Sequence, residues 1–236
     1  MIKNYKIKKK NANWNFKGKV YKNFDNHVRK SVPLYEETHN LYLKLSDFFL
    51  QNNSKIIDIG CSTGKFITTI YQKHYQNEKK ISFVGIDNVE EMVGYCKKKY
   101  HKEKIIFKKQ DINKYKFKNC CIIASFYTIQ FISPKERQKL INSIYTGLNW
   151  GGAFFFVEKV RGNDARFQDI MNQAYIDFKF EQGFSSDEIL SKSRSLKSVL
   201  EPFSTQGNID LLKRAGFKDI ITVFKYLSFE GFLAIK

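Results

Sequence analysis

Long hydrophobic runs are absent from this sequence of 236 residues. No stretch approaches the ~18 consecutive apolar residues of a membrane-spanning helix. The lysine-rich start is not followed by the ~7–15 apolar residues that form the core of a secretory signal. We therefore expect a cytoplasmic protein with no membrane association.

Cysteine is also scarce. The four cysteines are Cys61, Cys96, Cys120 and Cys121, and none belongs to a CxxC pair. This spacing argues against a disulfide framework and against a structural metal site. Cys120 and Cys121 begin an apolar run, so we expect them to pack as small hydrophobic residues.

Acidic residues are outnumbered by basic ones, 23 against 41, which gives a formal net charge of +18. Such an excess is common in proteins that bind nucleic acid. Eight of the first 22 residues are Lys and none is Arg, however, and no RNA-binding signature follows. We expect a solvated basic surface or an anionic small-molecule substrate, and no direct binding of nucleic acid.

Linkers and internal repeats are missing as well, which favours one main domain. Residues 1–30 are basic and polar with scattered aromatic residues, and we interpret them as an arm that packs through Trp14, Phe16, Tyr21 and Phe24. Residues 31–236 are then a single domain. A helical stretch at about 163–200 interrupts its pattern and is predicted to lie as an insertion over the ligand-binding edge.

Hydrophobic periodicity within the domain alternates between strand and helix. Strands are predicted over 55–59, 81–86, 104–108, 120–125, 153–157, 220–226 and 229–235. Helices are predicted over 34–50, 66–75, 89–100, 134–148 and 208–215, with Gly216 as a helix stop. This order predicts an α/β, Rossmann-like fold with a mostly parallel seven-stranded sheet.

The strongest local motif runs from Ile56 to Gly64, where a buried strand leads through a tight turn into a helix. Gly60 lets the backbone approach a ligand, and Gly64 permits close packing of helix on strand. A strand–turn–helix joint with no ligand would give the same pattern, so the motif needs support from elsewhere.

That support comes from the ends of the next two strands. Asp87 and Asn88 end the second strand, where an acid can accept hydrogen bonds from both ribose hydroxyls. Asp111 could bind the adenine amino group after the third strand, while Ile112 packs on the ring. Each could instead be a helix cap or a loop residue. The three motifs follow successive strands, which favours an adenosine ligand.

Two adenosine cofactors compete for this interpretation. NAD sites usually have a third glycine and an acid ~20 residues onward, and the acid here lies farther along. Asp58, just before the turn, could steer the amino group of a methionine moiety through the Gly60 loop. We therefore predict S-adenosylmethionine as the cofactor.

The sequence then resembles the carboxy-S-adenosyl-L-methionine synthase family, a branch of the class I methyltransferase fold, from Phe16 to Lys236. The matching words are Arg29-Lys30-Ser31-Val32-Pro33-Leu34-Tyr35, Asp58-Ile59-Gly60-Cys61-Ser62, Gly85-Ile86-Asp87-Asn88, Thr128-Ile129-Gln130-Phe131, Arg137-Gln138, Ile144-Tyr145, Gly147-Leu148-Asn149, Glu158-Lys159, Asp177-Phe178-Lys179 and Arg214-Ala215-Gly216-Phe217.

The resemblance implies a homodimeric enzyme that converts S-adenosylmethionine and prephenate to carboxy-S-adenosylmethionine and phenylpyruvate. In the family, a second enzyme uses the product to modify the wobble uridine of tRNA. The protein mainly positions its substrates and excludes water. By this resemblance, the cofactor-binding residues are Tyr35, Gly60, Cys61, Ser62, Asp87, Asn88, Asp111 and Ile112.

Two family positions differ in this sequence. Phe126 stands where the family has Asn, in the wall of the cofactor site. The family also has a Lys-Arg pair whose Arg reads the new carboxylate, whereas ungapped alignment gives Lys192-Ser193 here and places the arginine one residue later, at Arg194. One residue turns a helical side chain by ~100°. We expect Arg194, together with Tyr35, to act in catalysis.

Two other functions stay open. A diverged enzyme could transfer the unmodified methyl group, because Phe126 and Ser193 make the pocket less polar and favour the sulfonium through cation–π contact. A non-catalytic binding protein would also carry the fold, although the retained cofactor loops and Tyr35 argue against it.

Overall fold

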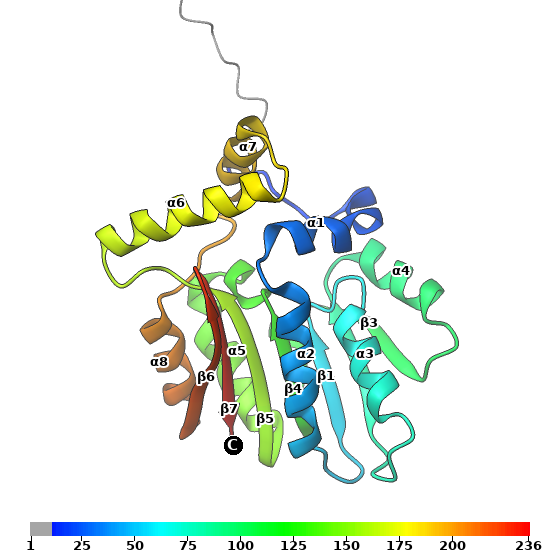
Figure 1. Cartoon of the computed structure of the whole chain (residues 1–236). Coiled ribbons are helices and arrows are strands. Elements are labelled where there is room, and N and C mark those ends of the chain that lie inside the picture. The colour runs from blue at the N-terminus through cyan, green and yellow to red at the C-terminus, as the bar shows by residue number, and fades with distance from the viewer. Residues whose placement is uncertain (1–10) are drawn as a thin grey trace, which may run out of the picture.

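A computed structural model gives the structure of residues 11–236 (Figure 1). The first ten residues of the expected arm lie outside the described residues. Within them, the strands form one seven-stranded sheet in the order β3-β2-β1-β4-β5-β7-β6. Their bounds are β1 (Lys55–Ile59), β2 (Ser82–Asp87), β3 (Ile105–Lys109), β4 (Cys120–Phe126), β5 (Leu148–Lys159), β6 (Asp219–Tyr226) and β7 (Phe229–Ile235). The predicted fold is confirmed.

The first five strands pair in parallel, and β7 pairs antiparallel with both β5 and β6. Chain order reverses between β1 and β4, so connections leave the sheet in opposite directions on either side of this pair. Ligands bind at such a switch point, outside the carboxyl ends of the strands. The sheet topology therefore fixes the site beside β1 and β4.

Helices cover both faces of the sheet (Figure 1). One face packs on α2 (Tyr35–Leu45), α3 (Lys65–His74) and α4 (Glu90–Lys99), and the other on α5 (Pro134–Gly147) and α8 (Thr205–Ala215). Strands buried on both sides need continuous apolar runs. In β5, Phe154 and Phe156 face the α5–α8 core while Phe155 faces the other, and all three are fully buried.

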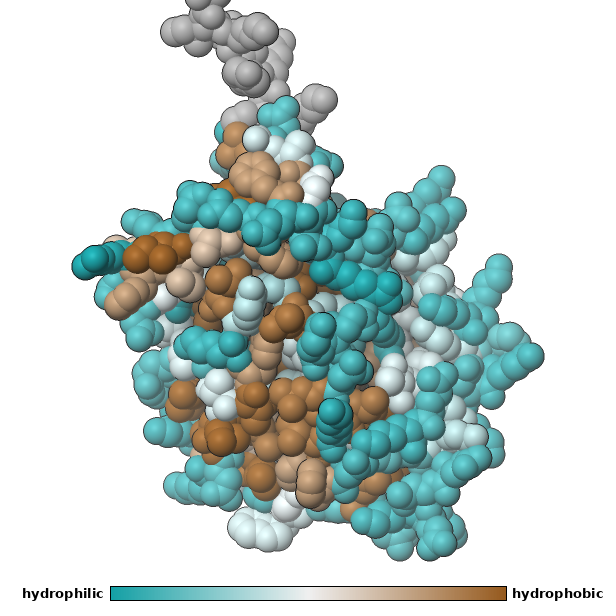
Figure 2. All heavy atoms as spheres, viewed as in Figure 1, coloured by the Kyte–Doolittle hydropathy of each residue, from teal (hydrophilic) through white to brown (hydrophobic). Residues whose placement is uncertain are grey.

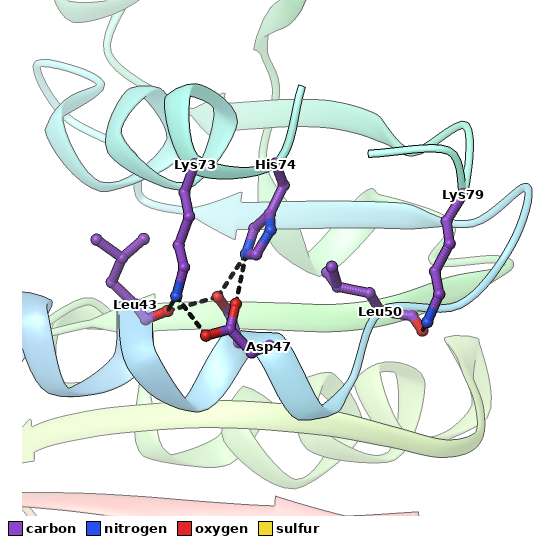
Figure 3. Close-up of polar contacts among 7 residues, drawn as sticks. Leu43, Asp47, Leu50, Lys73, His74 and Lys79 are labelled. Carbon is purple, nitrogen blue, oxygen red and sulfur yellow. Dashed lines mark hydrogen bonds and ion pairs between the residues drawn. The ribbon is translucent and has the colours of Figure 1, made fainter. Parts of the chain in front are cut away.

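Polar contacts fasten the carboxyl end of α2 to α3 (Figure 3). The Lys73 ammonium donates to the backbone oxygen of Leu43 and to the Asp47 carboxylate, at 2.7 Å each. His74 lies 3.8 Å from the same carboxylate. Lys79 donates to the backbone oxygen of Leu50 at 2.7 Å. These contacts hold in place the helix whose opposite end carries Tyr35.

Helical segments lie above the carboxyl edge of the sheet (Figure 1). From the expected insertion come α6 (Ala165–Glu181) and α7 (Ser186–Leu196), and from the expected arm come η1 (Gly18–Lys22) and α1 (Phe24–Ser31). The aromatic rings of the arm make edge-on contacts: Phe16 packs on Trp14, Phe24 and Phe131. The helix α1 was not predicted from the sequence. No helix within residues 11–236 has the length and apolar character of a membrane span.

Candidate active site

A large cavity opens at the carboxyl ends of β1, β2 and β4, beneath α6 and α7. Its volume is about 1670 Å³. All the residues predicted to bind the cofactor line it: Tyr35, Asp58, Gly60, Cys61, Ser62, Asp87, Asn88, Asp111, Ile112 and Phe126. The topology thus brings together side chains from five separate segments of the sequence.

The loop after β1 adopts a backbone that most residues avoid. Gly60 has φ of +68°, and a Cβ atom there would overlap the side chain of Thr128. Ser62 also has a positive φ, +50°, which is uncommon for a residue with a side chain. Strain of this kind clusters at ligand sites. In this loop, the two positive φ values produce a tight turn whose backbone faces the cavity without a side chain at Gly60.

Asp87, at the end of β2, is oriented by that loop. Its carboxylate accepts hydrogen bonds from the backbone nitrogens of Ser62 and Val89, at 2.9 Å each. Burial raises the pKa of Asp87, while these hydrogen bonds act in the opposite direction. Each carboxylate oxygen has a further lone pair. Asp87 can therefore accept a pair of hydroxyl groups without giving up its existing partners.

Asp58 lies deeper, with only 3% of its surface exposed. Burial, together with the nearby Asp87 charge, raises the pKa of Asp58 to about 8. A carboxyl group in this state gains most from a cationic ligand, because a positive charge favours its ionised form. The methionine ammonium predicted for this position is such a ligand.

An aromatic wall closes the cavity beside the Gly60 loop. The rings of Tyr35 and His39, on α2, lie 4.3 Å apart between centroids, and Phe126 packs edge-on against His39 at 4.6 Å. Burial lowers the pKa of His39 to about 3, so the imidazole is neutral near pH 7. Burial also raises the pKa of Tyr35. An uncharged aromatic wall suits a sulfonium cation.

The third predicted motif forms a short turn after β3. The Asp111 side chain accepts a hydrogen bond of 2.9 Å from the backbone nitrogen of Asn113, and so caps η3 (Ile112–Lys114). Asp111 is exposed, whereas Ile112 is buried and lines the cavity. Asp111 can cap η3 and also bind the adenine amino group, since a carboxylate has several acceptor positions.

Arg194 is not brought to the cavity with the others. Within the described chain, the wall includes Lys192, Ser193 and Lys197 but not Arg194. Its Nε atom is buried without a hydrogen-bond partner in residues 11–236. The single-residue shift explains the difference, because neighbours on a helix point ~100° apart. The role of Arg194 at the reacting carboxylate stays a prediction, which this position outside the cavity wall does not favour.

Sequence reasoning missed a group of residues in the same cavity. Lys159 follows the buried Glu158 at the end of β5, and Tyr175 and Lys179 come from α6. Glu158 accepts hydrogen bonds from the backbone nitrogens of Ile129 and Gln130, at 2.9 and 2.8 Å. The words Glu158-Lys159 and Asp177-Phe178-Lys179 were visible in the sequence, but nothing local showed that they meet.

The described residues contain no cluster of three or more His, Cys, Asp or Glu side chains arranged to hold a metal ion. The residues that line the cavity do fit S-adenosylmethionine. The loop leaves backbone where a Cβ would clash, and two buried carboxylates lie beside it. These features suit a ligand that has a diol and an ammonium group.

Comparisons with known proteins agree with this geometry. Residues 56–152 match a family model described as a methyltransferase domain. The chain is 39% identical to a carboxy-S-adenosyl-L-methionine synthase of Staphylococcus epidermidis, over 94% of this chain and 97% of that protein. It is 34% identical to the protein of the same name from Campylobacter lari, over 94% of each.

Solved structures share the fold at low identity. A methyltransferase dependent on S-adenosylmethionine from Archaeoglobus fulgidus matches with a TM-score of 0.61 at 13% identity, over 90% of this chain and 99% of that chain. Human N-acetylserotonin methyltransferase, in complex with S-adenosylmethionine, matches with a TM-score of 0.60 at 15% identity, over 86% and 52%. With the full-length relatives, the conclusion is that this chain belongs to the carboxy-S-adenosyl-L-methionine synthase family, whose fold is that of the class I methyltransferases.

Proposed function

We propose that this protein makes carboxy-S-adenosylmethionine from S-adenosylmethionine and prephenate. In that reaction prephenate loses carbon dioxide and its ring hydroxyl and becomes phenylpyruvate. The sulfonium methyl group gives up a proton and takes up the carbon dioxide as a carboxyl group, and the proton and the hydroxide leave together as water. The atoms therefore balance without an oxidant, a reductant or a metal ion.

The observation that carries this proposal is that the cofactor residues occupy only part of one continuous cavity. Its volume of about 1670 Å³ exceeds the ~300–1,000 Å³ of common small-molecule sites. The rest of the cavity lies between the end of β5 and the helices α6 and α7, and includes Lys159, Lys179 and Lys197. Such a chamber suits a second, anionic substrate held beside the first.

The protein's own part is to bind, to orient and to exclude water. Asp87 would hold the ribose hydroxyls, and Asp58 would hold the methionine ammonium. Tyr35, His39 and Phe126 would surround the sulfonium with rings and keep water from it. Positioning of two reactants in this way can supply much of a rate enhancement.

The test is to incubate the purified protein with S-adenosylmethionine and prephenate, and to follow both products by mass spectrometry. We expect carboxy-S-adenosylmethionine and phenylpyruvate in equal amounts, with neither formed when one substrate is left out. A protein that binds S-adenosylmethionine tightly and yet forms no carboxylated product would refute the proposal.

Methyl transfer to an unknown acceptor is the second candidate. It is favoured by Phe126, an apolar ring in the cofactor wall, and by the position of Arg194 outside that wall. The same incubation separates the two functions. Methyl transfer predicts no prephenate-dependent product, and instead predicts S-adenosylhomocysteine when the correct acceptor is added.

We also propose a symmetric homodimer that uses part of the α6–α7 region. Two large apolar residues of α6 that lie outside the cavity wall, Phe167 and Ile170, have about half of their surface exposed, 55% and 49%. Apolar surface gathers at one end of α6 in Figure 2, and again over the strands below it. Exposed patches of this kind are typical of protein interfaces.

A further inference from the structure

We propose that Lys159 and Lys179, both held against the ring of Tyr175, form the subsite that binds the carboxylates of the second substrate. The ligand class is a small dicarboxylic acid with an apolar ring or chain. The identity of the second substrate as prephenate rests on the proposed function. The binding of a dicarboxylate at these lysines does not depend on it.

The geometry centres on one aromatic ring. The Lys159 ammonium lies 4.3 Å from the centroid of the Tyr175 ring, and the Lys179 ammonium lies 4.5 Å from it. Lys159 ends β5 and Lys179 lies one helical turn beyond Tyr175 on α6. Two consecutive elements, β5 and α6, thus present two cations to one place in the cavity.

Neighbouring residues hold the backbone of Lys159 and the ring of Tyr175 in place. The backbone nitrogen of Lys159 donates to the Gln130 side-chain oxygen at 3.0 Å. The Tyr175 hydroxyl donates to the backbone oxygen of Ser31 at 2.7 Å, which joins α6 to the end of α1. Tyr175 therefore serves as a fixed support on which both ammonium groups rest.

The charge of this subsite is not compensated within residues 11–236. Neither lysine has a carboxylate within ion-pair distance in the described chain. Burial lowers the pKa of both groups to about 8, and the Lys179 charge adds to the effect on Lys159. Cation–π contact offsets only part of the cost of burying charge. An anionic ligand would offset the remaining cost of burying the two charges.

A continuous row of rings leads from the cofactor part of the cavity to this subsite. Tyr35 lies 6.2 Å from Tyr127, Tyr127 lies 5.9 Å from Phe229, and Phe229 lies 5.4 Å from Tyr175. All four rings line the cavity. A substrate with an apolar ring can pack along this row while its carboxylates meet the lysines.

The experiment separates binding from turnover. Calorimetry would measure the binding of prephenate, and of malonate as a simple dicarboxylate, to protein saturated with S-adenosylhomocysteine, which has no sulfonium methyl group to react. The variants are Lys159→Met and Lys179→Met, which keep the aliphatic length, and Lys179→Arg, which restores the charge. Lys135→Gln removes an exposed lysine of α5 outside the cavity wall and is the matched control.

We expect each Met variant to weaken both dicarboxylates about tenfold to a hundredfold, the effect of losing one charge-assisted hydrogen bond. Lys179→Arg should retain most of the affinity and Lys135→Gln nearly all of it. Affinity for S-adenosylmethionine, measured alone, should stay within about twofold in every variant, which also shows that each is folded.

The inference is overturned if wild-type protein binds neither dicarboxylate, or if the Met variants bind them as well as wild type does. If the lysines prove necessary for binding but wild-type protein does not convert prephenate, the subsite stands and the proposed reaction fails. If prephenate is converted with an unchanged KM in both Met variants, the reaction stands and the subsite fails.

Discussion

Asp87 is oriented by the protein's own backbone, because the Ser62 and Val89 nitrogens donate to its two oxygens. Such preorganisation means that little side-chain freedom remains to be lost when ribose binds. The same contacts make the acid a sensitive test of the cofactor assignment, since no other carboxylate ends β2.

Replacing Asp87 with Ala is expected to leave a folded protein with much weaker affinity for S-adenosylmethionine. Each charge-assisted hydrogen bond to a hydroxyl contributes about 1.5–3 kcal/mol. Calorimetry would measure the loss, with Asp87→Asn as the variant of similar shape and the exposed Glu78→Ala as the control. Unchanged affinity in Asp87→Ala would remove the assignment of this residue.

Asp58 gives a prediction about protons. Because its pKa is raised to about 8, the carboxyl group is mostly protonated near pH 7. A bound ammonium group favours the carboxylate, lowers that pKa and drives the proton off. We expect S-adenosylmethionine to release protons on binding at about pH 7, and the release to fade above about pH 9, where Asp58 is already ionised.

Calorimetry in buffers of different ionisation enthalpy would count these protons. Asp58→Asn cannot titrate, so it should lose the Asp58 contribution at every pH. Equal proton counts for the wild type and Asp58→Asn would show that Asp58 keeps its protonation state when the ligand binds, contrary to the prediction.

At the level of elements, most of the sheet could be predicted because its signals are local. Strands such as β1 are short apolar runs, and the predicted cofactor residues lie at the end of a strand or just after one, except Tyr35 at the start of α2. The strand β5 is the exception, since it begins at Leu148, ahead of the predicted start at residue 153, and its early part contains Gly151 and Gly152. Its first residues are held by distant partners: the Gly151 backbone nitrogen donates to the oxygen of Lys236 at 2.7 Å.

The misses share a physical cause. The helix α1 is amphipathic but only eight residues long and contains no buried residue, and it lies in the basic, polar stretch that the sequence analysis interpreted as an arm. Lys159 and Tyr175 meet only because α6 crosses the carboxyl edge of the sheet. The role predicted for Arg194 is open for the same reason, since the orientation of its side chain depends on where α7 begins, and a family pattern displaced by one residue does not reveal it. Local sequence patterns predict where loops and strand ends lie. Contacts between separate elements can be seen only in the tertiary structure.

For the whole molecule, the expected assembly makes a prediction about size. The chain has a mass of 27.8 kDa, and we expect light scattering at micromolar concentration to report about twice that value. Ile170→Asp, which places a charge on the exposed face of α6, should shift the protein toward monomer, because a buried unpaired charge is costly.

Ile221→Asp, on the exposed face of β6, is the matched control. A wild-type protein that stays monomeric would contradict the proposed dimer. Dissociation by Ile221→Asp but not by Ile170→Asp would place the interface on the sheet face instead of on α6.

The antiparallel strand β7 has a consequence for biosynthesis. Its position between β5 and β6 means that β5 leaves the ribosome well before its partner, with α6, α7, α8 and β6 translated in between. Until Phe229–Ile235 emerges, one edge of β5, with Phe154, Phe155 and Phe156, has no strand to pair with. Open apolar edges invite aggregation. The nascent chain is therefore expected to depend on chaperones over this interval, and slower translation after β5 would lengthen it.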